Sequence, residues 1–365
     1  MLEVSFHHHL PGFDLDVGFE VPGGTTVLFG GSGSGKTTVI NVVAGLLRPS
    51  QGRAVLDGRV LFDLSAGHWQ RPQKRRVGYI FQEARLFPHM SVRQNLKYGR
   101  WFSPKSRRQE DIGRIIEMLG IGSLLDRQPM TLSGGEKQRV AIGRALLSNP
   151  ELILADEPLA ALDQARKEEI LPYFERLRDE MKIPMLYVTH SAAEVARLAT
   201  TVVVLKGGEV QRQGGAEAVL ADASVLPTGV RAVGALLQAR VKAHHEDGLS
   251  ELVAGGISLY LPRVKQQQGQ MVRLRIQAHD VILARHRPQD ISALNVLPGT
   301  IDHIRSGNGP GAMVSLTTPA GSILARVTRR SAQAMGLATG MTCYAVVKSV
   351  AVAPSDIGGM ADPAP

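Results

Sequence analysis

The run from Gly30 to Thr37 constrains the fold of this chain more than any other feature. It follows a short β-prone segment, Thr25 to Phe29, and precedes apolar residues that recur at roughly helical spacing from Val39. The run fits the pattern G-x-x-x-x-G-K-[S/T], whose glycines let backbone N–H groups converge on phosphate oxygens at the positive end of a helix. The order strand, loop, helix therefore predicts an α/β domain that binds a nucleotide; a glycine-rich turn with an exposed lysine is the alternative.

Two side chains of this phosphate loop have expected roles in binding ATP. Lys36 is placed to hold the β- and γ-phosphates, and the Thr37 hydroxyl to bind Mg²⁺, which prefers oxygen ligands and is shared with the phosphates. The candidate ATP-binding residues are Gly30, Gly31, Ser32, Gly33, Ser34, Gly35, Lys36, Thr37 and Thr38.

A second segment supplies carboxylates. Residues 151–155 read Glu-Leu-Ile-Leu-Ala, an apolar strand that runs into Asp156 and Glu157. In α/β sheets of this kind the carboxyl ends of the strands meet at the edge where the phosphate loop lies. We therefore expect Asp156 to hold Mg²⁺ through water and Glu157 to polarise the attacking water. Without the phosphate loop, a strand followed by two acids would be read as a solvated strand end.

The segment Leu132 to Gln138, with the sequence Leu-Ser-Gly-Gly-Glu-Lys-Gln, starts a predicted helix. Ser133 suits the N-cap position, and Gly134 and Gly135 expose backbone donors at the positive end of the helix. The segment is thus a second candidate anion site. Two phosphate-binding elements in one chain suggest one ATP gripped from opposite sides, whereas an isolated segment of this kind is most often an ordinary helix start.

The N-terminal part of the chain shows both strand and helix periodicities. Strict alternation over Phe13 to Val21 predicts a half-buried antiparallel strand, and the Asp57-Gly58 pair predicts the turn of a second hairpin. From Phe87 to Leu132 the apolar spacing becomes helical. This stretch is interpreted as a helical insertion in an α/β domain.

Later segments predict a buried parallel sheet and then a separate β domain. Continuous apolar runs at 152–155, 185–188 and 202–205 are typical of parallel strands covered on both faces. Beyond a boundary near Val230 the pattern is all-β. We therefore expect an α/β domain with a mixed sheet and a helical subdomain over 1–230, and a β-barrel domain over 231–365.

Composition limits the class of protein. The 365 residues are 44% hydrophobic and 21% charged, which excludes a disordered or collagen-like chain. No uncharged apolar stretch approaches the ~18 residues that a membrane-spanning helix needs, and the N-terminus shows no recognisable secretion signal. The single cysteine, Cys343, cannot form an internal disulfide, as expected of a cytosolic chain.

The net charge of +9 is spread along the chain. Residues 1–230 carry 28 basic and 25 acidic side chains, a balance of +3, and residues 231–365 carry 14 and 8, a balance of +6. A diffuse basic surface fits nucleic acid, anionic lipid headgroups or small anions, and charge alone does not choose among them. We expect no nucleic-acid partner.

With these motifs in this order, the first 230 residues resemble the ATP-binding subunit of ABC transporters. In this resemblance Gly30–Thr38 matches the Walker A loop, Gln82 the Q-loop and 132–138 the signature motif. Further along, 152–157 matches the Walker B strand, Ala160–Asp163 the D-loop and His190 the switch histidine. It implies catalytic roles for Glu157, Gln82 and His190, and contacts to Mg²⁺ from Gln82 besides those of Thr37 and Asp156. In isolation, Gln82 and His190 would be read as a surface amide and a strand-end histidine.

The resemblance also implies an assembly. ATP would lie in a head-to-tail homodimer between one subunit's Walker A loop and the other's Ser133, Gly134, Gly135 and Gln138. ATP closes such a pair and hydrolysis reopens it, which can drive a membrane partner. The implied partners are two transmembrane permease subunits and a periplasmic or extracellular solute-binding protein. The implied location is the cytoplasmic face of the cell inner membrane, as a peripheral subunit.

The adenine contact stays open at this point. The family usually stacks an aromatic residue on adenine near the first strand, and here His7, His8, His9 and Phe13 compete for that place. The three histidines also suggest a metal site. A solvated surface tract is the preferred interpretation, because we expect no acidic or sulfur ligand nearby.

Two regions narrow the resemblance to the ATP-binding subunit of the molybdate importer. One is Lys74–His89, and the other is a C-terminal region that resembles a molybdate-binding Mop domain, an OB-like barrel, with its closest match over 291–352. Such domains bind a tetrahedral dianion between subunits, which here implies molybdate. Leu294 stands where the family carries arginine, so a purely structural barrel is the alternative. The candidate oxyanion contacts are Ser292, Asn295, Lys348 and Ser349.

The sequence therefore predicts the ATP-hydrolysing subunit of an importer, which couples ATP binding and hydrolysis to molybdate uptake. One alternative is import of another solute, such as sulfate, tungstate, iron or sugar. A second is a soluble ABC ATPase that acts on nucleic acid or ribosomes, against which the chain has one cassette rather than two. A third is an oxyanion sensor with a vestigial ATPase, against which Lys36, Asp156 and Glu157 are all present.

Overall fold

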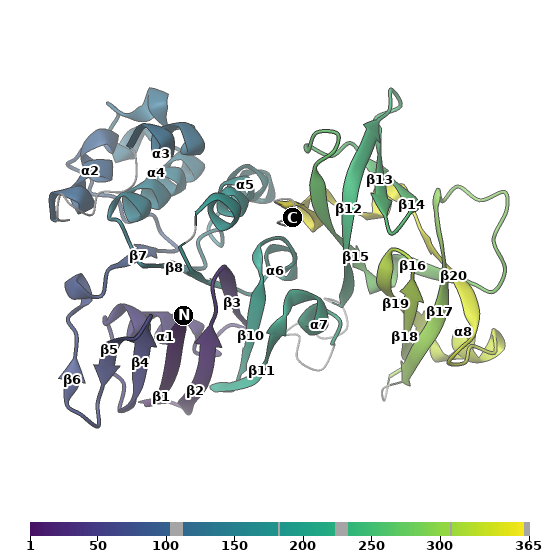
Figure 1. Cartoon of the computed structure of the whole chain (residues 1–365), viewed down its shortest axis with the longest axis horizontal. Coiled ribbons are helices and arrows are strands. Elements are labelled where there is room, and N and C mark those ends of the chain that lie inside the picture. The colour runs from purple at the N-terminus through teal and green to yellow at the C-terminus, as the bar shows by residue number, and fades with distance from the viewer. Residues whose placement is uncertain (103–111, 182, 223–232, 307–308, 361–365) are drawn as a thin grey trace. The chain divides into compact units, whose positions relative to one another are not determined.

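The computed structural model describes residues 1–102, 112–181, 183–222, 233–306 and 309–360. The chain forms two compact units, drawn in Figure 1. The first comprises Met1–Ser191 and Leu198–Gly215, and the second comprises Ala192–Arg197 and Ala216–Pro365. The predicted domain boundary near Val230 lies outside the described residues and stays a prediction.

The first unit is built on an 11-stranded mixed sheet. Its strands are, in spatial order, β6 (His68–Trp69), β5 (Arg59–Asp63), β4 (Gln51–Leu56), β1 (Leu2–Leu10), β2 (Phe13–Val21), β11 (Glu209–Gly215), β10 (Thr201–Lys206), β3 (Thr25–Gly30), β9 (Met185–Thr189), β8 (Leu152–Asp156) and β7 (Val77–Ile80). The predicted mixed α/β architecture is confirmed by this arrangement.

The parallel part of the sheet brings the predicted motifs to one edge. β3 pairs in parallel with β9 and β10, and β8 pairs in parallel with β7 and β9. Every residue of β3, β8 and β9 is buried, as the continuous apolar runs predict. Because parallel strands share a carboxyl edge, the segments that follow β3, β8 and β9 emerge side by side.

The antiparallel part follows the predicted alternation. In β2 the buried Leu15, Val17 and Phe19 alternate with exposed residues, and β2 pairs antiparallel with β1. The predicted hairpin is also present, since β4 pairs with β5 across a turn at Asp57 and Gly58, both of which have positive φ. The period-two pattern therefore predicted both the strand and the face that it buries.

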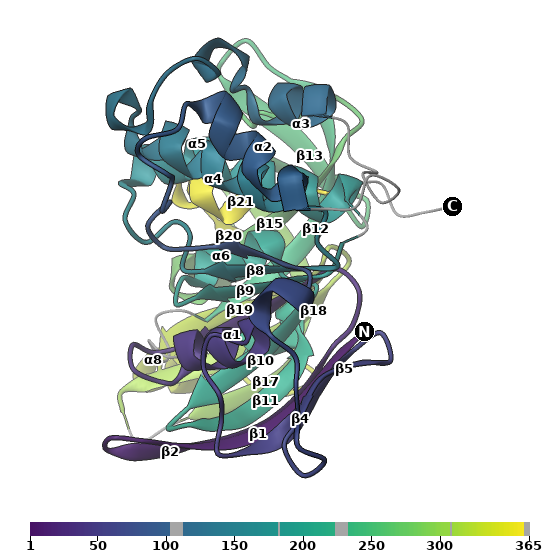
Figure 2. The same cartoon turned by 90° about the vertical axis from the view of Figure 1, so that its left-hand side faces the viewer.

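Helices cover the sheet and form the predicted helical insertion. α1 (Lys36–Ala44) follows β3 and packs on β3, β8 and β9, while α4 (Gly134–Leu147) packs on β7. Figure 2 shows α2, α3 and α4 gathered on one side of the sheet. The helices of this group and the one that follows β8 are α2 (Val92–Phe102), α3 (Ile112–Leu119), α4 and α5 (Gln164–Glu180).

The second unit contains two five-stranded sheets, and all of their pairings are antiparallel. Buried apolar residues of both sheets form one core. The predicted all-β domain is confirmed, with the short α8 (Arg329–Ala334) among its strands; α6 (Ala192–Leu198) and α7 (Ala216–Leu220) group with this unit as well. The strands are β14 (Ile257–Pro262), β13 (Leu249–Ala254), β12 (Gly234–His244), β15 (Met271–Gln277) and β21 (Ile357–Met360) in one sheet, and β16 (Val281–Ala284), β20 (Thr342–Val347), β17 (Asn295–Ser306), β18 (Gly311–Thr318) and β19 (Gly321–Thr328) in the other.

Candidate functional site

The phosphate loop lies between β3 and α1, and two of its glycines, Gly30 and Gly35, have no room for a side chain. A Cβ at Gly30 would lie 2.4 Å from the Leu205 carbonyl oxygen, and Gly35 adopts a φ of 97° as the N-cap residue of α1. No side chain caps this helix. The first backbone N–H groups of α1 thus remain available to an anion, as the motif predicts.

Lys36 lies inside the loop and is only 4% exposed. Its Nζ donates hydrogen bonds to the carbonyl oxygens of Gly30, at 3.0 Å, and Gly31, at 2.7 Å. Burial lowers the pKa of Lys36, and the nearby carboxylates of Glu157 and Asp156 partly oppose this. The ammonium group is therefore held at the loop by neutral carbonyls, which phosphate oxygens can replace as acceptors.

Asp156, at the end of β8, faces the first turn of α1. Its Oδ1 accepts a hydrogen bond from the Thr37 hydroxyl at 3.0 Å. Burial raises the pKa of Asp156, while the hydrogen bonds from Thr37 and Tyr79 act in the opposite direction. Thr37 and Asp156, the two residues predicted to contact Mg²⁺ from these segments, thus lie together and present oxygen atoms to one another.

Glu157 lies between two other predicted residues. Its Oε2 is 3.3 Å from His190 Nδ1, and its Oε1 is 3.8 Å from Lys36 Nζ. Glu157 follows β8 and His190 follows the neighbouring β9, so the pairing of these strands brings the two side chains together. Glu157 also has a φ of 42°, and a non-glycine residue in this region costs of order 1 kcal/mol and is often found at functional sites.

Gln82 is exposed and lies two residues beyond the end of β7. The neighbouring Phe81 connects this segment to α4, because Gln138 Nε2 donates to the Phe81 carbonyl oxygen at 3.4 Å. The signature-motif residue Gln138 is therefore buried within its own subunit and contacts the backbone that leads to Gln82. No described contact joins Gln82 itself to Thr37 or Asp156.

The signature segment forms the N-terminus of α4 as predicted. Ser133 is the N-cap, its Oγ accepts from the Glu136 N–H at 3.3 Å, and the Glu136 carboxylate accepts from the Ser133 N–H at 2.7 Å. This is a capping box, and it leaves Ser133 exposed at the helix start. The exposed Ser133 and the half-buried Gly134 thus lie at the positive end of α4, whereas Gly135 is buried.

The pairing of β1 with β2 separates the histidines. His7 and His9 pair across the strands with Asp16 and Asp14, and His9 Nδ1 is 2.5 Å from Asp14 Oδ1. The expectation of no acidic neighbour is therefore wrong, because antiparallel pairing brings residues 14 and 16 beside the tract. Within the described ranges, no group of three or more His, Cys, Asp or Glu is arranged to hold a metal ion.

His8 belongs to the opposite face of the hairpin. It pairs with Leu15, whose side chain packs against Gly35 of the phosphate loop. By strand alternation Phe13 lies on the same face as Leu15, while His7 and His9 do not. His8 Nδ1 is buried and has no hydrogen-bond partner among the described residues. Of the four competing residues, His8 and Phe13 thus lie on the phosphate-loop side.

The candidate oxyanion residues do not share one environment. Asn295 is buried, and its side chain accepts from the Tyr260 N–H at 2.7 Å and donates to the Tyr260 carbonyl at 2.9 Å. It therefore uses its amide to connect β17 to β14. Ser292 and Lys348 are exposed, whereas Ser349 is buried and its Oγ has no partner within the described ranges. Leu294 is 53% exposed.

Two residues near the predicted nucleotide site, Tyr79 and Asn41, were not predicted from the sequence. Tyr79 on β7 lies with its hydroxyl 3.0 Å from Asn41 Oδ1 and 3.4 Å from Asp156 Oδ2. Burial and the nearby Asp156 raise the pKa of Tyr79, so the phenol keeps its proton. The available signal was the spacing of Asn41 one helical turn after Thr37, which places both on one face of α1.

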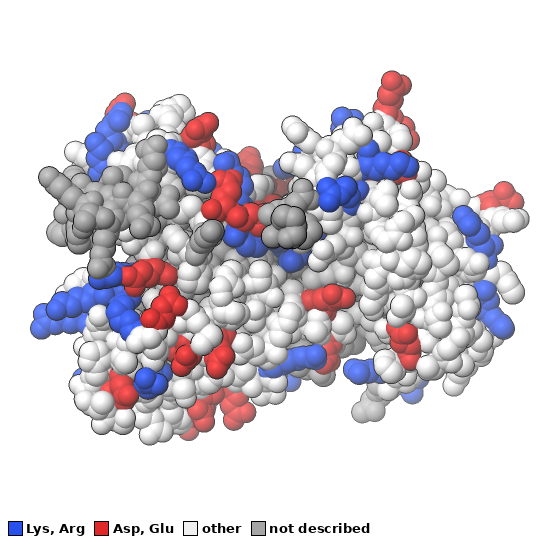
Figure 3. Space-filling view, in the orientation of Figure 1, with Lys and Arg blue, Asp and Glu red and all other residues white. Residues whose placement is uncertain are grey.

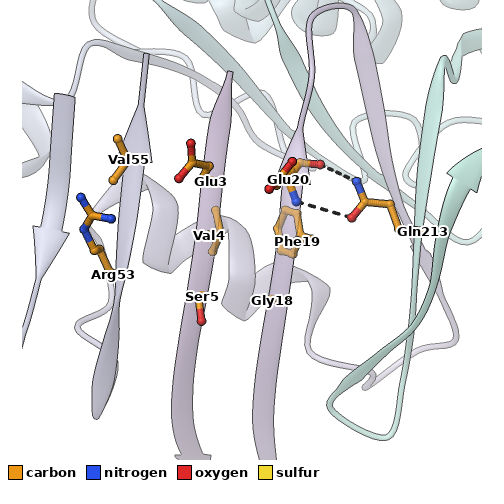
Figure 4. A pocket seen from close by; sticks show the side chains of 9 residues that line it. All are labelled: Glu3, Val4, Ser5, Gly18, Phe19, Glu20, Arg53, Val55 and Gln213. Carbon is orange, nitrogen blue, oxygen red and sulfur yellow. Dashed lines mark hydrogen bonds between the residues drawn. The ribbon is translucent and has the colours of Figure 1, made fainter. Parts of the chain in front are cut away.

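A hollow of about 700 Å³ lies on the antiparallel part of the sheet, lined among others by Glu3, Glu20, Arg53 and Gln213 (Figure 4). The Gln213 side chain bonds to the backbone N–H and carbonyl of Glu20, and so connects β11 to β2 away from their one paired position at Glu209 and Asp16. None of the predicted nucleotide-site residues lines this hollow. The residues predicted for the nucleotide site lie instead at the carboxyl edge of the parallel strands β3, β8 and β9.

The surface charge follows the diffuse pattern expected from the sequence. On the face shown in Figure 3, basic and acidic side chains are interspersed on each unit. None of the helices in the described part of the chain has the length and apolar character needed to cross a membrane.

Comparison with known proteins extends these observations. Residues 15–160 match the family model of the ABC transporter, and residues 291–354 match that of the TOBE domain. The molybdenum import ATP-binding protein ModC of Mesorhizobium japonicum is 52% identical over 351 residues, which are 96% of this chain and 95% of that protein. ModC of Rhizobium meliloti is 53% identical over 355 residues, 96% of this chain and 99% of that protein.

Solved structures agree with the fold of the first unit. cbiO1 from Clostridium perfringens, part of the ABC transporter complex cbiONQ, is 28% identical with a TM-score of 0.53 and covers 60% of this chain and 90% of that chain. A nucleotide-free ATP-binding cassette from an ABC transporter is 27% identical with a TM-score of 0.53 and covers 62% of this chain and 96% of that chain.

Proposed function

Because this chain belongs to the family of molybdenum import ATP-binding proteins of ABC transporters, we propose that it hydrolyses ATP to energise molybdate uptake through separate membrane subunits. One observation carries the hydrolase assignment: the Glu157 carboxylate lies between Lys36 and His190 at the end of β8. A protein that only bound nucleotide would need just the phosphate loop, whereas a protein that hydrolyses ATP also needs a base for the attacking water. Glu157 supplies that base.

The residues present fit ATP together with Mg²⁺. Ser34 Oγ is buried in the loop without a partner in the described ranges, and the N-terminus of α1 lacks a side-chain cap. Thr37 and Asp156 offer oxygen atoms, the ligands that Mg²⁺ prefers, within 3.0 Å of each other. When bound, Mg²⁺ neutralises charge on the phosphate oxygens. Gln82 is the further candidate for this ion, from the loop beyond β7.

The chain's own residues then divide the work of hydrolysis. Lys36 exchanges its carbonyl partners for oxygens of the β- and γ-phosphates and offsets their negative charge. Glu157 accepts a proton from the water that attacks the γ-phosphate. His190, 3.3 Å from Glu157, orients that carboxylate. His8 and Phe13, on the phosphate-loop side of the β1–β2 hairpin, are the candidates for contact with adenine.

The outward-facing start of α4 supports a head-to-tail homodimer. Ser133 is exposed and Gly134 half-buried at the positive end of α4, with Gly135 buried behind them, and this end suits the γ-phosphate held by a second copy. Gln138 supports this segment through the Phe81 backbone. The dimer would lie on the cytoplasmic face of the cell membrane and contact two permease subunits. A solute-binding protein would deliver the solute to these subunits.

The role of the second unit is part of the same proposal. Its TOBE domain is the candidate site for molybdate between subunits. Two observations support the assignment. Ser292 and Lys348 are exposed, and the buried Ser349 Oγ has no hydrogen-bond partner among the described residues. Asn295 is instead occupied by Tyr260, and Leu294 supplies no charge.

Reconstitution in vesicles with the co-purifying permease and binding protein tests the substrate. Molybdate on the binding protein should stimulate ATP hydrolysis, while sulfate or no oxyanion should not. Glu157→Gln keeps the phosphate loop but removes the base, so this variant should bind ATP without turnover. Equal rates with every oxyanion would refute molybdate as the substrate, and undiminished hydrolysis by Glu157→Gln would refute the role of that residue.

Complementation between inactive subunits tests the dimer. Lys36→Met and Ser133→Asp should each be inactive as homodimers, because each damages one half of both sites. Mixing them leaves one site in the mixed dimer with an intact loop and an intact signature segment, so hydrolysis should return. A mixture that stays inactive while wild-type mixtures remain active would contradict the head-to-tail arrangement.

A further inference from the structure

The Tyr79 hydroxyl contacts the carboxylate oxygen of Asp156 that Thr37 does not. Asp156 Oδ1 accepts the Thr37 hydroxyl at 3.0 Å, while Tyr79 reaches the other carboxylate oxygen, Oδ2, at 3.4 Å. The two oxygens of one carboxylate thus contact two different elements, α1 through Thr37 and β7 through Tyr79. This arrangement fixes the rotation of the carboxylate about its Cβ–Cγ bond.

Two further contacts fix Tyr79 itself. Its ring stacks on that of Phe81, the residue that follows β7, with ring centres 4.0 Å apart and planes at 17°. Its hydroxyl also lies 3.0 Å from Asn41 Oδ1 on α1. The side chain is therefore held along its ring and at its tip.

A phenol has one proton to donate, and two acceptors lie within reach. Asn41 Oδ1 is a neutral acceptor, whereas Asp156 Oδ2 carries charge, and hydrogen bonds to ionised acceptors are roughly twice as strong as neutral ones. When Asp156 is ionised, the charged oxygen is the stronger acceptor. Asn41 is then the competing acceptor rather than the functional one.

We propose that Tyr79 is a positioning residue for Asp156: its hydroxyl holds Oδ2, so that Oδ1 stays beside Thr37 as an oxygen offered to the Mg²⁺ of bound ATP. This inference rests on the proposed function, because it assumes that Thr37 and Asp156 serve that ion. Hydrogen-bond partners of ligating carboxylates orient them, and their loss typically costs 10–100-fold in metal affinity. Tyr79 extends the site to a residue of β7.

The test uses full-length protein, a non-hydrolysable ATP analogue and Mn²⁺, whose free ion is followed by electron paramagnetic resonance. Tyr79→Phe removes only the hydroxyl oxygen and keeps the ring that stacks on Phe81. It should raise the Mn²⁺ concentration for half-maximal binding about tenfold. Binding of the analogue without metal should stay at the wild-type level, since the phosphate loop is untouched.

Tyr173→Phe is the matched control. It also removes one half-buried hydroxyl, here one that accepts from Arg139 at 3.2 Å, outside the nucleotide site, and its Mn²⁺ requirement should equal that of the wild type. An unchanged requirement in Tyr79→Phe would overturn the proposal. An equal loss of analogue binding with and without metal would overturn it too, because this would show general damage to the site.

Asn41→Leu keeps the proposal testable if Tyr79→Phe folds poorly. It removes the competing acceptor and leaves Asp156 as the partner of the Tyr79 proton. We expect a Mn²⁺ requirement within about twofold of the wild type; a tenfold rise would show that packing between α1 and β7 sets the requirement, and would overturn the proposal. Wild-type protein that bound no Mn²⁺ with the analogue would instead refute the proposed function, and the inference with it.

Discussion

Buried polar side chains occur in both units, but they serve different purposes. In the first unit, Lys36 bonds to carbonyls that a phosphate can replace, and Ser34 Oγ lies in the loop without a partner in the described ranges. In the second unit, both polar atoms of the Asn295 amide form hydrogen bonds with the Tyr260 backbone. Burial of a polar group therefore does not mark a site; bonds that a ligand can exchange do.

A buried ion pair in the second unit is the clearest example of polar side chains that bond to one another and serve the fold. Arg275 Nη1 donates to Asp356 Oδ1 at 2.8 Å, and Gln277 Nε2 donates to the other carboxylate oxygen at 2.9 Å. Both charged side chains are less than 7% exposed. The group connects β15 to the 3₁₀ turn Pro354–Asp356 that precedes β21.

The largest expected effect is on turnover, from Lys36→Met. Groups that neutralise charge on a transferred phosphoryl are worth 10³–10⁵ in rate, so we expect turnover to fall at least about a thousandfold. Stability to urea should not fall, because a buried cation is replaced by an apolar side chain of similar length. Phosphate release and urea unfolding measure the two effects. If Lys36→Met unfolded at lower urea but kept wild-type turnover, Lys36 would be a structural residue rather than a phosphate-binding one.

The next largest effect is on stability, from Asp356→Leu. This change removes the carboxylate that pairs with the buried Arg275 guanidinium, and breaking a buried pair in this way costs about 3–5 kcal/mol. The double variant Arg275→Met with Asp356→Leu should recover most of that loss, because it removes both charges. Urea unfolding gives the free energies, and turnover per folded molecule should stay at the wild-type value. A large loss of turnover in the double variant would give this pair a part in catalysis.

Asn295→Ala sharpens the comparison at a predicted oxyanion residue. It leaves the Tyr260 N–H and carbonyl without their partner, and we expect a loss of about 2 kcal/mol in the free energy of unfolding. Ser292→Ala and Lys348→Ala are the matched controls, since both side chains are exposed and each change should stay within about 0.5 kcal/mol. Molybdate binding should weaken in Ser292→Ala and Lys348→Ala and stay unchanged in Asn295→Ala. The reverse pattern would restore Asn295 as a ligand.

Sequence reasoning predicted that the candidate nucleotide residues lie together because they follow the ends of neighbouring parallel strands. Once the parallel order of β3, β8 and β9 is given, Lys36, Asp156, Glu157 and His190 must emerge at one edge. The strand alternation of Phe13–Val21 similarly fixed the buried face. These are local rules with one geometric consequence.

The parts that were missed depend on contacts distant in sequence. Tyr79 reaches Asp156 from 77 residues away, and Asn295 reaches Tyr260 from 35 residues away. No periodicity encodes either partner. The acidic neighbours of the histidine tract were missed for a related reason. They lie beside it only through the antiparallel register of β1 and β2, which the sequence of the tract alone does not specify.

Two helix caps give the finest comparison between the units. Ser133 caps α4 through the Glu136 N–H, and Thr328 caps α8 through the Ser331 N–H at 3.0 Å. Replacing either residue by Ala should cost about 1 kcal/mol in the free energy of unfolding, since the same kind of bond is lost. Turnover should fall only with Ser133→Ala, because only that hydroxyl also faces a phosphate in the proposed dimer. Equal stability losses with equal turnover would reduce Ser133 to a cap, whereas a turnover loss in Thr328→Ala would mean that the β unit controls hydrolysis through its own folding.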